Sequence, residues 1–80
     1  MDVKDELIAE IGKWTTKIRD ERANVTATDK KSESFLKNID AYISDSQYFF
    51  EKGDHVRSFE ALVWAWAYLT IGKDEGILRG

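Results

Sequence analysis

Cysteine and proline are both absent from the 80 residues of this chain. Without cysteine there is no disulfide, no thiolate ligand for zinc and no thiol nucleophile. Without proline, no position rigidly breaks a helix. A chain this short buries a thin core, so a fold without disulfides depends on close packing, on a partner, or on both.

Long apolar runs and a basic excess are missing as well. No uncharged segment approaches the roughly 18 apolar residues of a membrane-spanning helix, and we expect no membrane association. The first residues are charged rather than apolar as in a signal peptide, so we expect a cytoplasmic protein. The formal net charge of −3 argues against a nucleic-acid partner, because nucleic-acid binders usually carry a basic face.

The apolar residues that are present follow a helical period. Near the N-terminus, Leu7, Ile11, Trp14 and Ile18 follow one another at steps of four, three and four, which places them on one face of a helix. This pattern predicts a helix over about residues 2–24, with Asp2 as its N-cap.

A second helix is predicted over about residues 32–52. Its apolar residues again recur at steps of three and four: Phe35, Leu36, Ile39, Tyr42, Ile43, Phe49 and Phe50. Thr28, Asp29 and Ser32 are all able to cap this helix, and the sequence leaves the three alternatives open. Gly53 and Asp54 follow as a helix stop and a new N-cap, which predicts a tight antiparallel hairpin.

The third predicted helix covers about residues 54–71, with Gly72 as its stop. It is apolar on nearly all sides and carries two stripes. The first stripe comprises Phe59, Leu62, Val63, Trp66 and Leu69; the second comprises Ala61, Trp64, Ala65, Tyr68 and Ile71. In a three-helix bundle one stripe faces the core, so we expect the second to need cover from the C-terminal tail, another chain or a ligand. The alternative is a wide core that takes in part of the second stripe, with the tail covering the rest.

The segment from Tyr48 to Ala61 contains the turn Phe-Glu-Lys-Gly-Asp followed by Phe-Glu-Ala. Together with residues 64–69 and Gly72, it resembles the short archaeal proteins of the domain of unknown function 357 family. The resemblance covers the second and third helices, about half of the chain. It implies an all-α, up-and-down three-helix bundle in a single domain, with an archaeal origin. It supplies no established activity and no catalytic residue.

Catalytic and metal-binding patterns are weak. The chain has one histidine, His55, and neither a nucleophile elbow nor a calcium-loop or metalloprotease spacing. A nucleophile, a base and an oxyanion donor do not occur together, so the sequence predicts a non-enzymatic protein without metal or cofactor.

The aromatic residues of the third helix give the leading functional hypothesis. Tryptophan and tyrosine are favoured at binding hot spots. We therefore predict a protein-interaction or self-association module centred on Trp64 and Tyr68, with Ile71 and Ala61 beside them. The partner is expected to be a second copy, forming a homodimer, or another protein.

A second hypothesis concerns the predicted Gly53–Asp54 turn. His55, Arg57 and Glu60 follow it closely and supply one titratable and two charged side chains. These residues would line a regulatory site for a small molecule or nucleotide. Arg57 and Glu60 are three residues apart, so the alternative is an ion pair between them, or one from Arg57 to Asp45 across the hairpin.

Overall fold

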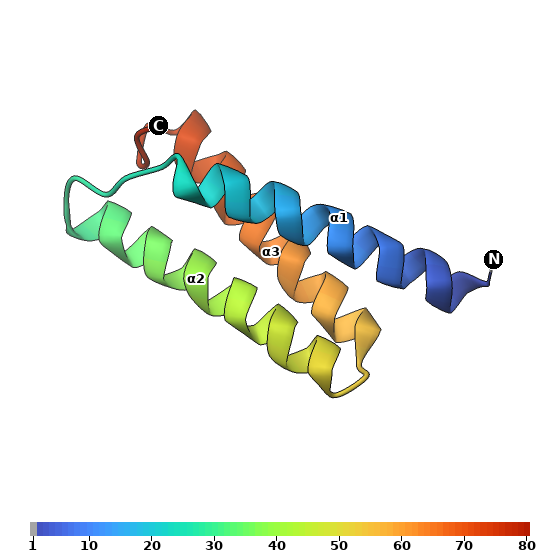
Figure 1. The fold of residues 1–80 in the computed structure, drawn as a ribbon. Coiled ribbons are helices and arrows are strands. Elements are labelled where there is room, and N and C mark those ends of the chain that lie inside the picture. Colours follow the sequence, from blue (N-terminus) through green and yellow to red (C-terminus); the bar gives the residue numbers. More distant parts are fainter. Residues whose placement is uncertain (1) are drawn as a thin grey trace.

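The computed structural model describes residues 2–80, and within them the chain forms three helices (Figure 1). Helix α1 spans Val3–Ala23, α2 spans Lys30–Glu51 and α3 spans His55–Asp74. They run up and down along an elongated molecule of 43 × 19 × 16 Å. The predicted all-α three-helix bundle is confirmed.

Side-chain caps define where α1 and α2 begin. The carboxylate of Asp2 accepts a hydrogen bond from the backbone N–H of Asp5, at 2.9 Å. Of the three candidates for the second cap, Asp29 is the one used: it accepts from the N–H of Ser32, whose hydroxyl accepts from the N–H of Asp29 in return. This reciprocal capping box starts α2 at Lys30, two residues before the predicted start.

The connection between α2 and α3 is the shortest in the molecule. Gly53 has a φ of +79°, in the left-handed region that glycine adopts without steric cost. Asp54 follows at once and caps α3 by accepting from the N–H of Arg57, at 3.1 Å. The turn therefore holds α2 and α3 antiparallel, and Figure 1 shows them side by side.

The predicted end of the third helix at Gly72 is wrong. Helix α3 continues to Asp74, and the glycine with positive φ (+70°) after it is Gly76. Gly72 instead lies buried against Leu78, because the C-terminal tail folds back and Leu78 is itself only 4% exposed. The backbone N–H groups of Ile77 and Leu78 both donate to the carbonyl of Gly72. This glycine therefore makes room for the tail rather than ending the helix.

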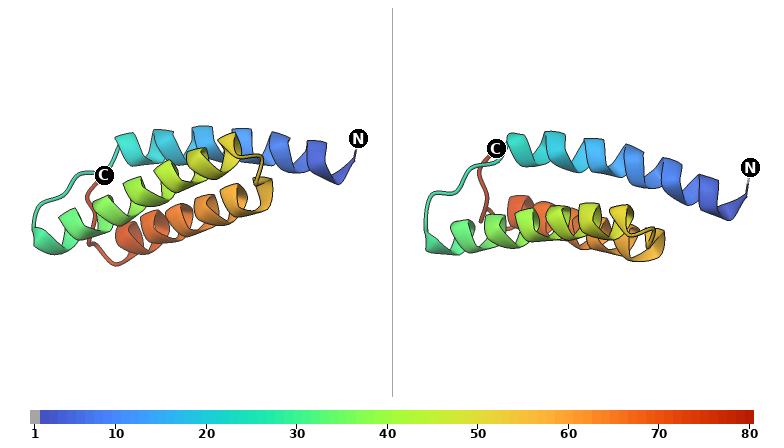
Figure 2. Two further views of the ribbon diagram at one scale, coloured as in Figure 1. Left: turned by 90° about the horizontal axis from the view of Figure 1, so that it is seen from below. Right: turned by 60° about the horizontal axis from the view of Figure 1, so that its bottom comes forward.

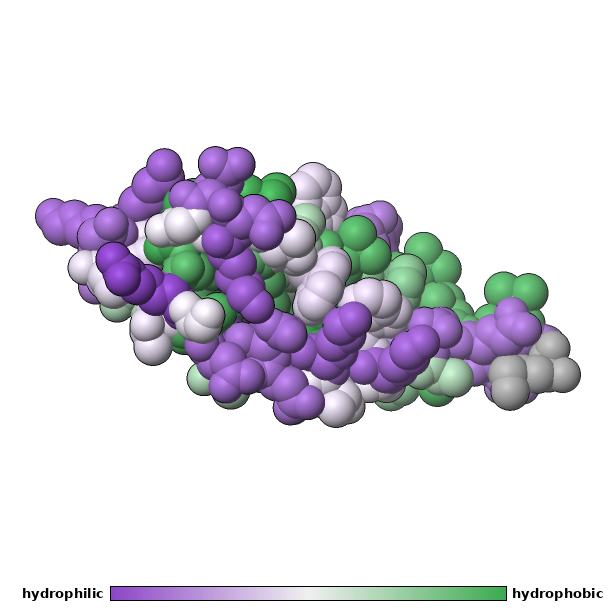
Figure 3. All heavy atoms as spheres, turned by 90° about the horizontal axis from the view of Figure 1, so that it is seen from above, coloured by the Kyte–Doolittle hydropathy of each residue, from purple (hydrophilic) through white to green (hydrophobic). Residues whose placement is uncertain are grey.

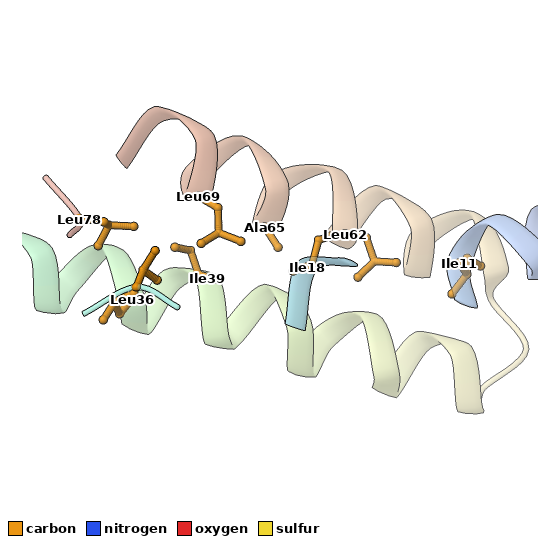
Figure 4. Packing of buried hydrophobic residues seen from close by; sticks show 9 residues of the cluster. Ile11, Ile18, Leu36, Ile39, Leu62, Ala65, Leu69 and Leu78 are labelled. Atoms are coloured by element: carbon orange, nitrogen blue, oxygen red, sulfur yellow. The ribbon is translucent and has the colours of Figure 1, made fainter. Parts of the chain in front are cut away.

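Helix α3 occupies the middle of the arrangement. It packs against both α1 and α2, whereas direct contact between α1 and α2 is slight. Figure 2 shows α1 apart from the paired α2 and α3 in a view turned by 60°. The buried core runs the length of α3, and Figure 4 shows its labelled members: Ile11, Ile18, Leu36, Ile39, Leu62, Ala65, Leu69 and Leu78.

This central position changes the interpretation of the two stripes on α3. From the first stripe, Trp66 packs edge-on against Trp14 of α1, with ring centroids 5.4 Å apart. From the second, Tyr68 contacts Phe35 and Tyr42 of α2 at 5.4 and 5.7 Å. The expectation that the second stripe needs the tail, another chain or a ligand is therefore wrong for Tyr68. It is covered by α2 because α3 has a neighbour on each side.

The role of Gly72 predicts the effect of replacing it. A Cβ at Gly72 would lie 2.6 Å from Cδ1 and 2.8 Å from Cγ of Leu78, so Gly72→Ala should displace the tail and lower the free energy of unfolding by about 1–3 kcal/mol. A Cβ at Gly12 of α1 meets nothing within 4 Å, so Gly12→Ala is the matched control and should stabilise by about 0.5–1 kcal/mol. Urea unfolding followed by circular dichroism measures both. Equal effects of the two substitutions would contradict the assigned packing.

The capping box also predicts an acid-sensitive contribution to stability. Hydrogen bonds from the backbone and hydroxyl of Ser32 lower the pKa of Asp29 below its ordinary 3.8. Because the folded-state pKa is the lower one, this stabilisation is present above about pH 4 and is lost as the pH falls through the folded-state pKa.

Asparagine keeps the cap but does not titrate, so Asp29→Asn should reduce the fall in urea midpoint between about pH 6 and pH 2.5. Some dependence should remain, because Lys73 lowers the pKa of Glu21 by hydrogen bonding. An unchanged acid dependence in Asp29→Asn would contradict the assignment.

Candidate functional site

The side of α3 that faces away from α1 and α2 carries accessible apolar side chains, beside the exposed Glu60 and Thr70. Val63, Trp64 and Ile71 are 52%, 53% and 52% exposed, and the half-buried Ala67 lies among them. We call these four residues the outer face of α3. A hollow of about 210 Å³ is formed where three of them meet Phe35 and Tyr68. An exposed cluster of this kind on a small monomer is typical of a contact surface.

The predicted interaction residues lie partly on this face. Trp64 and Ile71 belong to it, and the Trp64 ring stacks on Tyr42 of α2 at 6.2 Å. Tyr68 is half-buried beside it. Ala61, which was predicted to share the surface, is 7% exposed and belongs to the core. Val63, predicted to be in the core, is exposed instead. Helix α3 packs against both α1 and α2, and Val63 lies on the side that neither helix covers.

The structure does not bring His55, Arg57 and Glu60 together into a ligand site. The His55 ring packs edge-on against Phe50 at 5.1 Å. Arg57 pairs with the cap carboxylate of Asp54 at 3.4 Å, and not with Glu60 or Asp45 as predicted. A wide hollow beside the turn includes His55 among its lining residues, but neither Arg57 nor Glu60.

Sequence reasoning missed a groove between α1 and α2. It has a volume of about 360 Å³, and its floor is the buried hydrogen bond between the hydroxyls of Ser46 and Ser58, at 3.0 Å. The complete lining is Ile8, Ile11, Gly12, Thr15, Arg19, Ile43, Ser46, Gln47, Phe50 and Ser58. One signal was present in the sequence: Gly12 lies within a helix, where alanine would be more stable. In the structure, no neighbouring atom requires its small size.

Polar contacts tie the helices together at the opposite end of the molecule from the hairpin turn. Arg22 of α1 forms a two-bond ion pair with Asp40 of α2, at 2.7 and 3.0 Å, and this hydrogen bonding raises the pKa of Arg22. Lys73 of α3 pairs with Glu21 of α1 at 2.8 Å.

Toward the beginning of α1, apolar residues are exposed between the hydrophilic side chains (Figure 3).

Neither a metal-ligating cluster nor a membrane-spanning helix occurs in the described part of the chain. Within residues 2–80, no three His, Cys, Asp or Glu side chains lie close enough to hold a metal ion. Every buried side-chain nitrogen and oxygen of these residues has a hydrogen-bond partner. None of the three helices is both long and apolar enough to cross a bilayer. The surfaces worth testing are therefore the outer face of α3 and the groove.

Comparison with known proteins places the chain in a family. A family model described as a protein of unknown function (DUF357) matches residues 13–78. The chain belongs to the DUF357 family. The match extends beyond the hairpin into α1, further than the sequence resemblance.

A solved member of the family has the same fold. The crystal structure of the DUF357 protein AF1782 from Archaeoglobus fulgidus is 46% identical and superimposes with a TM-score of 0.88. The alignment covers 98% of this chain and 97% of that one, so the three-helix arrangement is shared throughout. This neighbour agrees with the archaeal origin implied by the resemblance. The comparison with curated proteins gives no match.

Proposed function

We propose that this DUF357 protein is a non-enzymatic interaction module that self-associates through the outer face of α3. The observation that carries the proposal is the half-exposed state of Trp64 and Ile71 on a helix whose other sides are already packed. Burying large apolar side chains is the main driving force of protein association. Tryptophan at the centre of a patch is also a frequent hot spot.

A second copy fits this face because the charges at its two ends are complementary. A two-fold axis brings the same patch of each copy together, so two α3 helices meet antiparallel. If the axis passes between Trp64 and Ala67, Arg57 of one copy lies at the same height along the helix as Asp74 of the other, both about 13 Å from the axis. Arg57 pairs with Asp54 of its own helix, but its side chain is 67% exposed, and Asp74 is also exposed, so both can take part in this pairing.

Removing the central aromatic side chain tests the proposal. Over a dilution series, light scattering should show a mass that falls from dimer to monomer. Trp64→Ala should raise the dimer dissociation constant about 30-fold, the equivalent of about 2 kcal/mol. Tyr48→Ala is the matched control, since Tyr48 is a similarly exposed aromatic residue (57%) on α2, and it should leave the dissociation constant unchanged. Circular dichroism verifies that both variants keep their helices.

Charge reversal then tests the geometry within the same experiment. Arg57→Asp should weaken the dimer, and adding Asp74→Arg should restore it. Both changes favour the α3 dipole, because they place an acid in the first turn and a base in the last, so the fold should survive. A wild-type monomer at every concentration, or equal affinity of the wild type and Trp64→Ala, would overturn the proposal.

A further inference from the structure

The groove between α1 and α2 is a separate feature from the outer face of α3, and it is asymmetric along its length. At one end, Nη2 of Arg19 reaches across to donate to Oε1 of Gln47, at 3.3 Å. Beyond this bridge lies the Arg22–Asp40 ion pair, which also joins the two helices. At the other end, near Ile8 and the partly exposed Phe50, no such bridge is formed among the described residues. The groove is therefore closed by polar side chains at one end and open at its apolar end.

Charge is concentrated at the closed end. Arg19 is the one charged residue in the lining, and the four large apolar side chains of the walls are those of Ile8, Ile11, Ile43 and Phe50. Among the described residues no carboxylate lies within ion-pair distance of Arg19, whereas Arg22 and Arg57 are paired. A guanidinium at the end of an apolar channel is complementary to a ligand with an apolar chain and an anionic head.

Gly12 supports the interpretation of the groove as a binding site. Glycine within a helix is less stable than alanine by up to about 1 kcal/mol, and here a Cβ would not meet any neighbouring atom within 4 Å. The small size of Gly12 therefore does not serve contact between α1 and another helix. It leaves the groove open beside Ile11, which is 4% exposed and forms part of the wall.

The dimensions favour a chain-like ligand over a peptide. A helix is about 10 Å across, and to lie along the channel it would have to break the hydrogen bond by which Arg19 and Gln47 span it. An extended peptide would bring backbone N–H and C=O groups that need partners. The floor has no hydroxyl hydrogen left for a peptide carbonyl, because Ser46 donates to Ser58 and Ser58 donates to the carbonyl of Ser46. From Ile8 to Arg19 the channel is about 16 Å long, and 360 Å³ lies within the usual range of small-molecule sites.

We propose that this groove binds a free long-chain carboxylate, with the alkyl chain between Ile11 and Phe50 and the carboxylate on Arg19. Dodecanoate is the probe, titrated below its micelle concentration at low salt and followed calorimetrically. One molecule should bind per chain, and isoleucine methyl resonances of the groove should shift in NMR spectra while those of Ile71 should not.

Substitutions at two positions separate the parts of the site. Gly12→Leu should fill the channel and abolish binding without loss of thermal stability, whereas Gly12→Ala should retain it. Arg19→Gln should weaken dodecanoate binding by roughly tenfold or more, the size of a lost charge-assisted hydrogen bond. Dodecyltrimethylammonium, which has the same chain and the opposite charge, should bind the wild type more weakly than dodecanoate, and Arg19→Glu should reverse that preference.

The outcomes distinguish this site from the outer face of α3. Trp64→Ala should leave dodecanoate affinity unchanged, so a failure of the dimer proposal does not affect this test. Absence of binding, equal affinity for both head groups, or unchanged binding in Gly12→Leu would each overturn the proposed site.

Discussion

The packing of α3 against two helices that hardly touch each other is the constraint on which the structure depends. A chain of 80 residues buries a limited core, and here nearly all of that core is organised along α3. Trp66 meets Trp14 on one side and Tyr68 meets Phe35 on the other. Leu78 closes the end of the core by packing on Gly72. A helix in this position has to be apolar on most of its circumference, as α3 is.

Both proposed surfaces follow from that arrangement. Because α1 and α2 pack mainly on α3 and are joined to each other by a few polar side chains, a channel is left between them, and Gly12 is part of its lining. Because neither helix fully covers the side of α3 on which they lie, Trp64 and Ile71 remain accessible. The two surfaces have different chemistry: the channel ends in a guanidinium, whereas the outer face is apolar between Arg57 and Asp74. An interaction module and an amphiphile site are therefore compatible within one small domain.

Features encoded locally could be predicted from the sequence, whereas those that depend on which helix is central could not. The cap at Asp2 and the turn at Gly53 are each formed by residues that are neighbours along the chain. Such local signals, together with the helical period of the apolar residues, were enough to predict the number and order of the helices. Periodicity placed Ala61 and Val63 on stripes but not on the correct sides, since it does not show where each neighbouring helix lies. Gly72 was misassigned because glycine serves helix ends and close contacts equally well. The groove joins residues of α1 and α2 that are far apart along the chain.

Amide hydrogen exchange tests the central position of α3 most directly. Opening α3 has to break its contacts with both neighbours, so its amides from Leu62 to Leu69 should exchange only through global unfolding. Helix α1 has one helical neighbour and an exposed first turn at Val3, and its early amides should exchange much faster. The predicted result is a protection order with α3 highest and the start of α1 lowest. Protection in α1 equal to or greater than that in α3 would contradict the account.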